Sequence, residues 1–405
     1  MKILHITPSY KPAYIYGGPI QSVSKLCEAL TVLSEKREAK SEVDVRVLTT
    51  TANGRTELGV TLNKPILVES VPVTYFKRWT KDHSHFSPGL LFNLRKEILR
   101  CTPDDNLAIH IHAWWNLVSV LSCCIAQWYK VPVVLSPRGM LAAYTQNNHH
   151  SIYKKLLHHL MGKKLLRYCH IHATSEQEKR DILQIIKPKS IAVIPNLVNL
   201  ASGVTSIESK VANIESQVSS PDKPKSSSFK LIFLSRIEEK KGLELLFDAL
   251  SLLDIDWQLT IAGSGREEYV ESLKLKAQHL QLNQRINWVG RISDQDKYCL
   301  MADQDLLVLT SYNENFANIV IESLSVGTPI LVSDQVGLSD YVNEQQLGWV
   351  CRLEAENIED KLINAFKDQI KRENIRQLAP EIIKNDFNDQ ALAKRYLELY
   401  KSLAH

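Results

Sequence analysis

Short β-rich segments alternate with amphipathic helical segments along the chain, and this alternation limits the possible folds more than any other feature. In the first half, strands are expected at 2–7, 43–49, 71–76, 107–113, 131–136, 170–174 and 191–194. Helices are expected between them, at 19–33, at 117–129 and from Ser175 onward. Strands that alternate with helices predict a mostly parallel sheet with helices on both faces.

A serine-rich segment interrupts the alternation. Nine of the 28 residues from 201 to 228 are serine, which is typical of an exposed linker. The pattern then restarts, with strands at 230–235, 257–262, 285–288, 305–309 and 329–333, helices at 242–253, 267–280 and 316–326, and helices to the end. The expected fold is therefore α/β, with two Rossmann-like doubly wound domains at 1–200 and 229–387. A ligand would bind in a cleft between them, at the carboxyl ends of the strands.

The charge of the chain is divided unevenly between these domains. Residues 1–200 carry 26 Lys and Arg against 14 Asp and Glu, whereas the remainder carries 23 against 31. A cationic first domain suggests an anionic partner or surface, although a solvated basic face would give the same count. The 44% hydrophobic and 23% charged residues are close to the globular average, which excludes disordered and fibrous classes.

The segment Thr310–Asp334 contains the most informative motif, two glutamates with seven residues between them. Eight helical steps do not stack two side chains, so Glu314 is expected in a loop and Glu322 two turns inside a helix. The amides at the start of that helix would then form an anion site. The amides concerned are those of Phe316, Ala317, Asn318 and Ile319. A plain helix with a solvated Glu322 is the alternative.

Two further motifs follow predicted strands. Arg236 and Lys241, in LSRIEEKKG, could together neutralise a diphosphate leaving group without a metal. They could instead be surface charges that pair with the neighbouring glutamates. Gly17 and Gly18 lie between the first strand and a helix, where glycine allows close backbone approach, although many such loops only turn the chain.

Together these motifs resemble the retaining nucleotide-sugar glycosyltransferases of the GT-B fold, family 4 (glycosyl transferases group 1). The resemblance covers nearly the whole chain. It is strongest from Lys230 to Ser333, where SR-x4-KG, IAGSG, WVGR and E-x7-E follow one another in the family's order. It also implies that a terminal helix, at about 388–405, crosses back to the first domain.

The resemblance implies a role for each motif. Glu314 would hold hydroxyls of the donor sugar, Glu322 would hold the ribose, and Arg236 and Lys241 would bind the diphosphate. Arg291 would lie near the base. The remaining donor-side residues would be Gly17 and Gly18, which match the family's glycine loop, and the amides of Phe316, Ala317, Asn318 and Ile319.

The first domain departs from the family pattern in one loop. Many relatives have a histidine after the fifth strand, near the sugar's C6 hydroxyl, where this chain reads SPRGM with Arg138. The histidine's role is therefore unassigned. His112, at the end of another strand and followed by two tryptophans, could contact the acceptor together with Arg138, although histidine and aromatics there could equally be core packing.

No metal or separate cofactor is expected. Histidine pairs occur at 83/85, 110/112 and 170/172, and the last two lie in predicted strands, where residues i and i+2 share a face, but no carboxylate or cysteine cluster accompanies them. The seven cysteines show no zinc spacing and suit a reducing compartment. Nucleic-acid binding would need stacking or base-reading groups beside the charge, and none is evident.

The segment 151–167 combines an apolar stripe with flanking lysines. Such a segment could lie on an anionic membrane surface where a lipid-linked acceptor is presented, or it could pack on the first domain. We therefore expect a cytoplasmic protein that could associate peripherally with the membrane.

The expected activity is transfer of a sugar, with retention, from a UDP- or GDP-sugar to a hydroxyl of a glycan or lipid-linked acceptor in cell-surface polysaccharide synthesis. No carboxylate is evidently placed as a covalent nucleophile, which favours front-face attack. The alternatives are a nucleotide-sugar epimerase or hydrolase on the same fold, and a non-catalytic nucleotide-sugar-binding scaffold.

Overall fold

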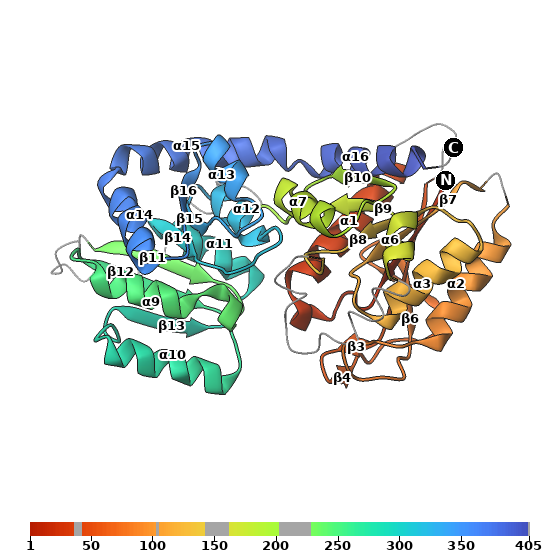
Figure 1. Ribbon diagram of the computed structural model, residues 1–405, viewed down its shortest axis with the longest axis horizontal. Coiled ribbons are helices and arrows are strands. Elements are labelled where there is room, and N and C mark those ends of the chain that lie inside the picture. Colours follow the sequence, from red (N-terminus) through yellow and green to blue (C-terminus); the bar gives the residue numbers. More distant parts are fainter. Residues whose placement is uncertain (36–42, 103–104, 142–161, 202–227, 404–405) are drawn as a thin grey trace. The chain divides into compact units, whose positions relative to one another are not determined.

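The computed structural model describes residues 1–35, 43–102, 105–141, 162–201 and 228–403, and the chain divides into two compact units (Figure 1). Unit 1 consists of Met1–Val198 and Phe387–His405, and unit 2 of Asn199–Asp386. The predicted linker at 201–228 lies almost entirely outside the described residues.

Unit 1 contains an eight-stranded sheet in the order β10-β9-β8-β7-β1-β2-β6-β5. Its strands are β1 (Lys2–Thr7), β2 (Asp44–Thr50), β5 (Pro65–Val68), β6 (Val71–Phe76), β7 (Leu107–His112), β8 (Val133–Ser136), β9 (His170–Ala173) and β10 (Ser190–Val193). All neighbours are parallel except β5 and β6. A small hairpin, β3 (Ala52–Asn53) and β4 (Thr56–Glu57), follows β2.

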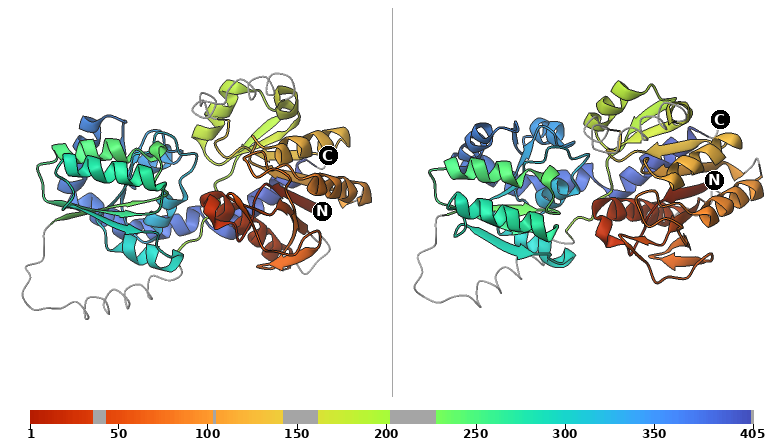
Figure 2. Two further views of the ribbon diagram at one scale, coloured as in Figure 1. Left: turned by 90° about the horizontal axis from the view of Figure 1, so that it is seen from below. Right: turned by 60° about the horizontal axis from the view of Figure 1, so that its bottom comes forward.

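Helices cover both faces of this sheet (Figures 1 and 2). They are the 3-10 turn η1 (Tyr14–Tyr16), α1 (Gly18–Glu35), α2 (Pro88–Arg100), α3 (Leu117–Trp128), α6 (Lys163–Tyr168), α7 (Glu176–Ile185) and α16 (Asp389–Lys401). Alternate residues of β1 and β7, such as Ile6 and Ile111, join a buried apolar cluster with α2, α3 and α6. Helix α16 packs on α1. In β1 and β7 the residues that alternate with these apolar side chains include His5 and His110.

Unit 2 contains a parallel six-stranded sheet in the order β13-β12-β11-β14-β15-β16. Its strands are β11 (Phe229–Leu234), β12 (Trp257–Ala262), β13 (Ile286–Gly290), β14 (Leu306–Leu309), β15 (Ile330–Ser333) and β16 (Gly348–Cys351). Its helices are η4 (Glu239–Lys241), α9 (Leu243–Leu252), α10 (Glu267–His279), α11 (Asp294–Ala302), α12 (Asn318–Ser325), α13 (Ser339–Glu344), α14 (Ala355–Lys367) and α15 (Gln369–Asp386). The strands β14 and β15 are fully buried, as expected for a parallel sheet with both faces covered.

The two α/β sheets confirm the predicted fold class, and most predicted strand and helix bounds agree with the structure to within one or two residues. Two expectations were wrong. The prediction of helices alone after 333 missed β16, a short strand flanked by helices. The helix of the E-x7-E segment begins at Asn318, not Phe316, so Glu322 lies just over one turn inside it instead of two. The structure also adds β5 and α2, which the pattern did not predict.

Candidate active site

The strand order of unit 2 creates a switch point between β11 and β14. From β11 the chain continues to β12 on one side, whereas β14 is followed by β15 on the other side. Crevices at the carboxyl ends of strands bind ligands where the order reverses in this way. The loops that leave β11 and β14 carry Lys241 and Glu314, so the two residues meet at this point although 73 positions separate them.

Lys241 and Glu314 form a direct ion pair that is largely shielded from solvent. Burial opposes the charge on Glu314, but the Lys241 ammonium outweighs it and holds the pKa of the carboxyl below its usual value. Burial lowers the pKa of Lys241, and the attraction of Glu314 only partly offsets this effect. The pair therefore presents an ionised carboxylate and an ammonium side by side.

Backbone contacts fix the loops that carry the pair. The Tyr312 amide donates to the Lys240 carbonyl oxygen at 2.8 Å, which joins the β14 loop to η4. The Glu314 amide donates to the Gln335 carbonyl at 3.1 Å, and the Glu314 carbonyl accepts from the Gly337 amide at 2.7 Å. Glu314 is thus held from both sides by main-chain bonds, independently of its side-chain partner.

Gly242 follows Lys241 for a steric reason. Its φ is +67°, and a Cβ there would meet the Thr310 carbonyl oxygen at 2.2 Å. The Thr310 hydroxyl donates to the Gly242 carbonyl oxygen at 3.0 Å, so the two loops touch through their backbones. Only glycine permits this approach, which explains the glycine of the KKG motif.

Arg236 and Arg291 lie at the carboxyl ends of β11 and β13, which are separated in the sheet by β12. Arg236 follows β11, is about half exposed, and pairs with Glu238 at 2.7 Å, which is the pairing that the sequence left open. Arg291 follows β13 and is exposed. Both side chains are accessible to an anion or a base. Arg236 pairs with Glu238, whereas Glu314 pairs with Lys241.

The start of α12 lies directly after the Glu314 loop. Phe316 and Ala317 are buried and precede the helix, while Asn318 and Ile319 form its first turn and are partly exposed. Ala317 has a left-handed backbone with φ +67°, and its methyl side chain cannot cap the helix. Ala317 therefore supplies no side-chain cap at this end of α12, where the helix dipole favours a ligand anion.

Glu322 has a partner that the sequence did not reveal. It is buried in α12, and its Oε1 lies 2.9 Å from Nζ of Lys297, which is buried on α11. Burial raises the pKa of Glu322 above its usual value, although the Lys297 cation opposes this shift. No short motif contains Lys297, because only the packing of α11 on α12 brings it to the glutamate.

Unit 1 has a switch point of its own, between β1 and β7. Gly17 ends η1 with φ +67°, and Gly18 is the exposed first residue of α1, so both follow β1. His112 is the last residue of β7 and is buried. The Arg138 guanidinium lies 3.5 Å from Nδ1 of His112, and it donates to the Ser22 hydroxyl at 2.8 Å. The two residues predicted on the acceptor side therefore lie together.

A chain of buried hydrogen bonds runs beneath these residues across three strands. His172 Nε2 lies 2.8 Å from the Ile194 carbonyl oxygen and must donate to it, which leaves Nδ1 to accept from the Ser136 hydroxyl at 2.6 Å. Ser136 then accepts from His110 Nε2 at 2.6 Å, and His110 Nδ1 accepts from the Tyr400 hydroxyl at 2.7 Å. This assignment gives each ring one donor and one acceptor nitrogen, and the chain ties α16 to the sheet.

In the part of the chain that the structure describes, the ring nitrogens of His5, His110 and His112 lie within 4.8 Å of one another, as metal ligands would. Hydrogen bonds already engage both nitrogens of His110, and the Arg138 cation lies beside His112. Burial, with a smaller contribution from the Arg138 cation, lowers the pKa of His5 to about 3. The cluster is therefore suited to a neutral hydrogen-bonded network and poorly suited to a cation.

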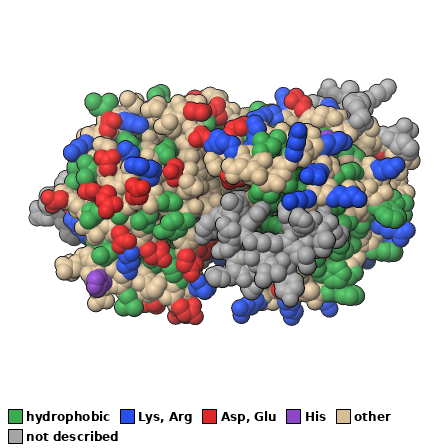
Figure 3. Space-filling model, viewed as in Figure 1, with side chains coloured by type: hydrophobic (Ala, Val, Ile, Leu, Met, Phe, Trp, Pro, Cys, Tyr) green, Lys and Arg blue, Asp and Glu red, His purple; other side chains and the backbone are tan. Residues whose placement is uncertain are grey.

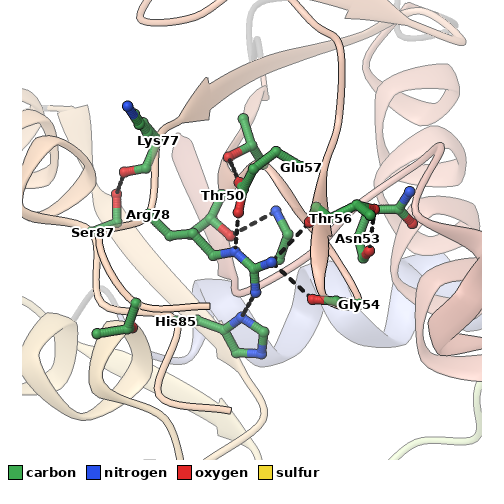
Figure 4. Close-up of polar contacts among 12 residues, drawn as sticks. Thr50, Asn53, Gly54, Thr56, Glu57, Lys77, Arg78, His85 and Ser87 are labelled. Atoms are coloured by element: carbon green, nitrogen blue, oxygen red, sulfur yellow. Dashed lines mark hydrogen bonds and ion pairs between the residues drawn. The ribbon is translucent and has the colours of Figure 1, made fainter. Parts of the chain in front are cut away.

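Arg78 organises the loops beside the glycine segment, and sequence analysis missed it (Figure 4). Its fully buried guanidinium donates to the carbonyl oxygens of Gly54 and Thr56, both at 2.8 Å, and pairs with Glu57 at 2.7 Å. The Gly54 amide in turn donates to the Tyr16 hydroxyl at 2.9 Å. Arg78 thereby anchors the β3–β4 hairpin against the loop that carries Gly17.

The predicted membrane segment 151–167 lies outside the described residues except for its last part, from 162 onward. There, Lys164 and Arg167 on α6 are exposed while Leu165 and Leu166 are buried in the core. Among the residues that the structure describes, no helix combines the length and the hydrophobicity needed to span a bilayer.

Comparison with protein families decides the affiliation of the chain. Residues 33–202 match the sequence model described as Glycosyltransferase Family 4, and residues 216–382 match Glycosyl transferases group 1. The chain belongs to glycosyltransferase family 4. The resemblance carried by the Arg236–Glu322 motifs is thus confirmed at the level of the family.

Curated relatives of this family-4 protein have diverse activities. It is 24% identical to N-acetyl-alpha-D-glucosaminyl L-malate synthase of Bacillus anthracis over 174 residues. This match covers 42% of this chain and 44% of the relative. It is 25% identical over 180 residues to phosphatidyl-myo-inositol mannosyltransferase of Mycobacterium leprae, covering 43% and 46%. The chain thus spans less than half the length of these two relatives.

Solved structures share the fold over the whole chain. Anabaena HepE in complex with UDP-glucose is 18% identical, with a TM-score of 0.70 and coverage of 99% of this chain and 100% of HepE. The lipopolysaccharide outer core galactosyltransferase WaaB is 17% identical, with a TM-score of 0.70 and coverage of 99% of both chains. These similarities assign the GT-B fold to the family-4 chain.

Proposed function

We propose that this protein transfers a sugar, with retention of configuration, from a nucleoside diphosphate sugar to a hydroxyl of a glycan or lipid-linked acceptor. The donor would be a UDP- or GDP-sugar, and the product would contribute to cell-surface polysaccharide. The observation that carries the proposal is the shielded Lys241–Glu314 ion pair at the switch point of unit 2.

The pair offers the two groups that a nucleotide-sugar donor needs. The carboxylate of Glu314 can accept hydrogen bonds from adjacent sugar hydroxyls, because the neighbouring cation keeps it ionised. The ammonium of Lys241 can bind a diphosphate oxygen and stabilise the charge that develops as the sugar–phosphate bond breaks. Arg236 and the amide end of α12 would add to this stabilisation.

The nucleoside end of the donor would interact with the Glu322–Lys297 pair and with Arg291. The buried Lys297 keeps a cation next to Glu322, which favours a carboxylate able to accept from two ribose hydroxyls. A departing phosphate oxygen could take the proton of the attacking acceptor hydroxyl, so no protein base is needed on that face. In unit 1, His112 and Arg138 would act on the acceptor side.

The relatives support the same class of reaction. HepE was solved with UDP and with UDP-glucose, and WaaB and LpsE of Rhizobium meliloti are described as lipopolysaccharide glycosyltransferases. These descriptions motivate UDP-sugars as the first donors to test and lipid-linked oligosaccharides as the first acceptors.

Thermal unfolding with UDP, GDP, ADP and dTDP in large excess tests the donor class. A ligand at about a hundred times its Kd adds roughly 2.7 kcal/mol, which raises the Tm by several degrees. We expect one of these nucleotides to stabilise the protein strongly. If all four leave the Tm unchanged, the donor site is wrong.

Release of the nucleoside diphosphate, measured with and without acceptor, separates the proposed transferase from an epimerase or hydrolase. Transfer requires the acceptor, and the new glycosidic bond, examined by NMR, should keep the donor's anomeric configuration. Equal turnover without any acceptor would favour the alternatives, and binding without turnover would identify a scaffold.

A further inference from the structure

The solvent face of α2 has an unusual composition for a soluble protein. Its exposed residues are spaced at i, i+3, i+4, i+7 and i+8 and therefore form one stripe along the helix. They are Phe92, Arg95, Lys96, Leu99 and Arg100. The stripe combines two large apolar side chains, 57% and 59% exposed, with three cations and no carboxylate.

This composition is not explained by packing within unit 1. The opposite face of α2 already supplies the core, through Leu90, Leu94 and Ile98, which are buried. The one carboxylate of the helix, Glu97, is buried and pairs with Lys2 at 2.9 Å, with Arg46 at 3.4 Å and with Arg100 of the stripe at 3.3 Å. Phe92 and Leu99 therefore remain exposed although the helix has its own buried stripe.

Neighbouring helices extend the same pattern. Trp128, the last residue of α3, is 83% exposed, and the adjoining Lys130 is exposed as well. The Arg95 guanidinium donates to the Tyr129 hydroxyl at 2.8 Å, which joins the stripe of α2 to the end of α3. On α6, which packs on α3, Lys164 and Arg167 are exposed.

We call this surface the α2–α3–α6 face; it consists of Phe92, Arg95, Lys96, Leu99, Arg100, Trp128, Lys130, Lys164 and Arg167. The only carboxylate in the three helices is the buried Glu97. Figure 3 shows Lys, Arg and hydrophobic side chains mixed over the part of unit 1 that carries these helices.

We propose that the α2–α3–α6 face binds the surface of an anionic lipid bilayer. Phe92, Leu99 and Trp128 enter the boundary between headgroups and acyl chains, and the surrounding cations contact anionic headgroups. Tryptophan favours this boundary because its ring is apolar while its N–H can reach water. The inference goes beyond the proposed reaction and does not depend on the donor.

The chemistry of the face favours a bilayer over two other occupants. A protein partner fits less well, because charged residues, lysine in particular, are depleted from the centres of protein interfaces, whereas cations here are interleaved with the apolar side chains. A nucleic acid would use the cations, but the aliphatic side chain of Leu99 would gain nothing from its phosphates. A bilayer uses both kinds of side chain at once.

Vesicle co-sedimentation of the full chain tests the proposal. The probes are vesicles of phosphatidylcholine alone and of phosphatidylcholine mixed equally with phosphatidylglycerol. We expect binding to the mixed vesicles that weakens with salt, and much weaker binding to the neutral ones. Absence of binding to mixed vesicles at low salt, or equal binding to both kinds, overturns the proposal.

A matched pair of triple variants tests the location. Arg95→Gln/Lys96→Gln/Arg100→Gln should weaken binding about a hundredfold, at about fivefold for each cation removed. The control, Lys274→Gln/Lys361→Gln/Lys384→Gln, makes the same change of charge on unit 2 and should bind as the wild type does. Equal losses in both triple variants would show a net-charge effect and refute the location.

A second pair tests the apolar contribution and the competing occupant. Brominated acyl chains should quench part of the wild-type tryptophan fluorescence, and Trp128→Gln should lose that part, whereas Trp79→Gln should retain it. Trp79 is the control because it is 73% exposed and lies in the loop after β6, outside the three helices of the face. If sedimentation velocity without lipid shows self-association that the Arg95/Lys96/Arg100 variant abolishes, the occupant is a second copy and the bilayer proposal fails.

Discussion

Replacing Lys241 should separate the structural role of the Lys241–Glu314 pair from its chemical role. In Lys241→Met the carboxylate of Glu314 loses its cation while it stays shielded from water. Removing one partner of a buried ion pair typically costs about 3–5 kcal/mol. For a unit the size of Asn199–Asp386, this lowers the Tm by roughly 6–20 °C.

The loss should depend on pH in a defined direction. In the wild type the pKa of Glu314 is depressed, so its stabilisation is present above the unfolded value of 4.5 and is lost as the pH falls through the folded value. In Lys241→Met, burial raises the pKa of Glu314 and only the weaker influences of Lys240 and Arg236 oppose it. The difference in stability between the two proteins should therefore shrink as the pH falls from about 7 toward about 4.5.

The matched control is the double variant Lys241→Met/Glu314→Gln, which removes both charges. It should regain most of the lost stability, to within about 1–2 kcal/mol of the wild type, since no buried charge is left unpaired. Its kcat/KM should nevertheless stay about 10²–10³ lower, the usual cost of losing one group that stabilises a developing charge. Urea unfolding and nucleotide release measure the two effects. If the double variant regains activity, or if Lys241→Met is as stable as the wild type at pH 7, our account of the pair is wrong.

Three other changes give further tests. Lys297→Met should raise the donor KM about tenfold or more with a smaller effect on kcat, because it perturbs Glu322 on the nucleoside side. Lys297→Arg should largely restore the KM, because it keeps the cation. Equal losses in both variants would contradict this role. Gly242→Ala should destabilise the protein by more than about 2 kcal/mol in urea unfolding, because of its positive φ and the contact of the new Cβ with Thr310; a neutral effect would contradict the backbone contact. Burial lowers the pKa of His172 to about 3, below its unfolded 6.5, so its stabilisation is present above pH 6.5 and is lost as the pH falls below that value. His172→Gln should reduce the slope of stability against pH below 6.5 by about 1.4 kcal/mol per unit, and an unchanged slope would show that the ring is not buried neutral.

The fold could be predicted from the sequence because parallel strands buried on both faces leave a strong local signal. Runs such as 229–234 and 330–333 are almost continuously apolar, and glycine or proline bounds many of them. The strand β16 was not predicted because it has only four residues, GWVC, between two helical segments. Helix α12 begins later than predicted because Ala317 adopts a left-handed conformation, which nothing in an alanine signals.

Sequence motifs could single out the candidate residues but not the contacts between them. Lys241 and Glu314 could each be singled out by motif, yet their pairing depends on β11 lying next to β14. Lys297 could not be found, because a lysine on an amphipathic helix has no local signature and only the packing of α11 on α12 brings it to Glu322. Arg78 was missed for the same reason, since its partners lie in a separate hairpin.

For the histidines of unit 1, the sequence pattern predicts a shared strand face but not the partners of the rings. Pairs at i and i+2 of a strand do share a face, as the spacing predicts. The structure joins His110 and His172 through Ser136 and ties them to Tyr400 of α16. Because these bonds cross elements that are far apart in sequence, the spacing of the histidines cannot reveal them.

Calorimetric titration of UDP and GDP tests the central claim, that the Lys241–Glu314 pair forms the donor site, most directly. The wild type, Lys240→Met and Lys241→Met/Glu314→Gln would be compared, because Lys240 is the adjacent cation in the same loop and pairs with Glu238 instead. Our account predicts that one nucleotide binds the wild type and Lys240→Met with Kd values within about threefold, and binds the double variant at least about thirtyfold more weakly, a loss of about 2 kcal/mol. Equal binding by all three proteins would contradict it.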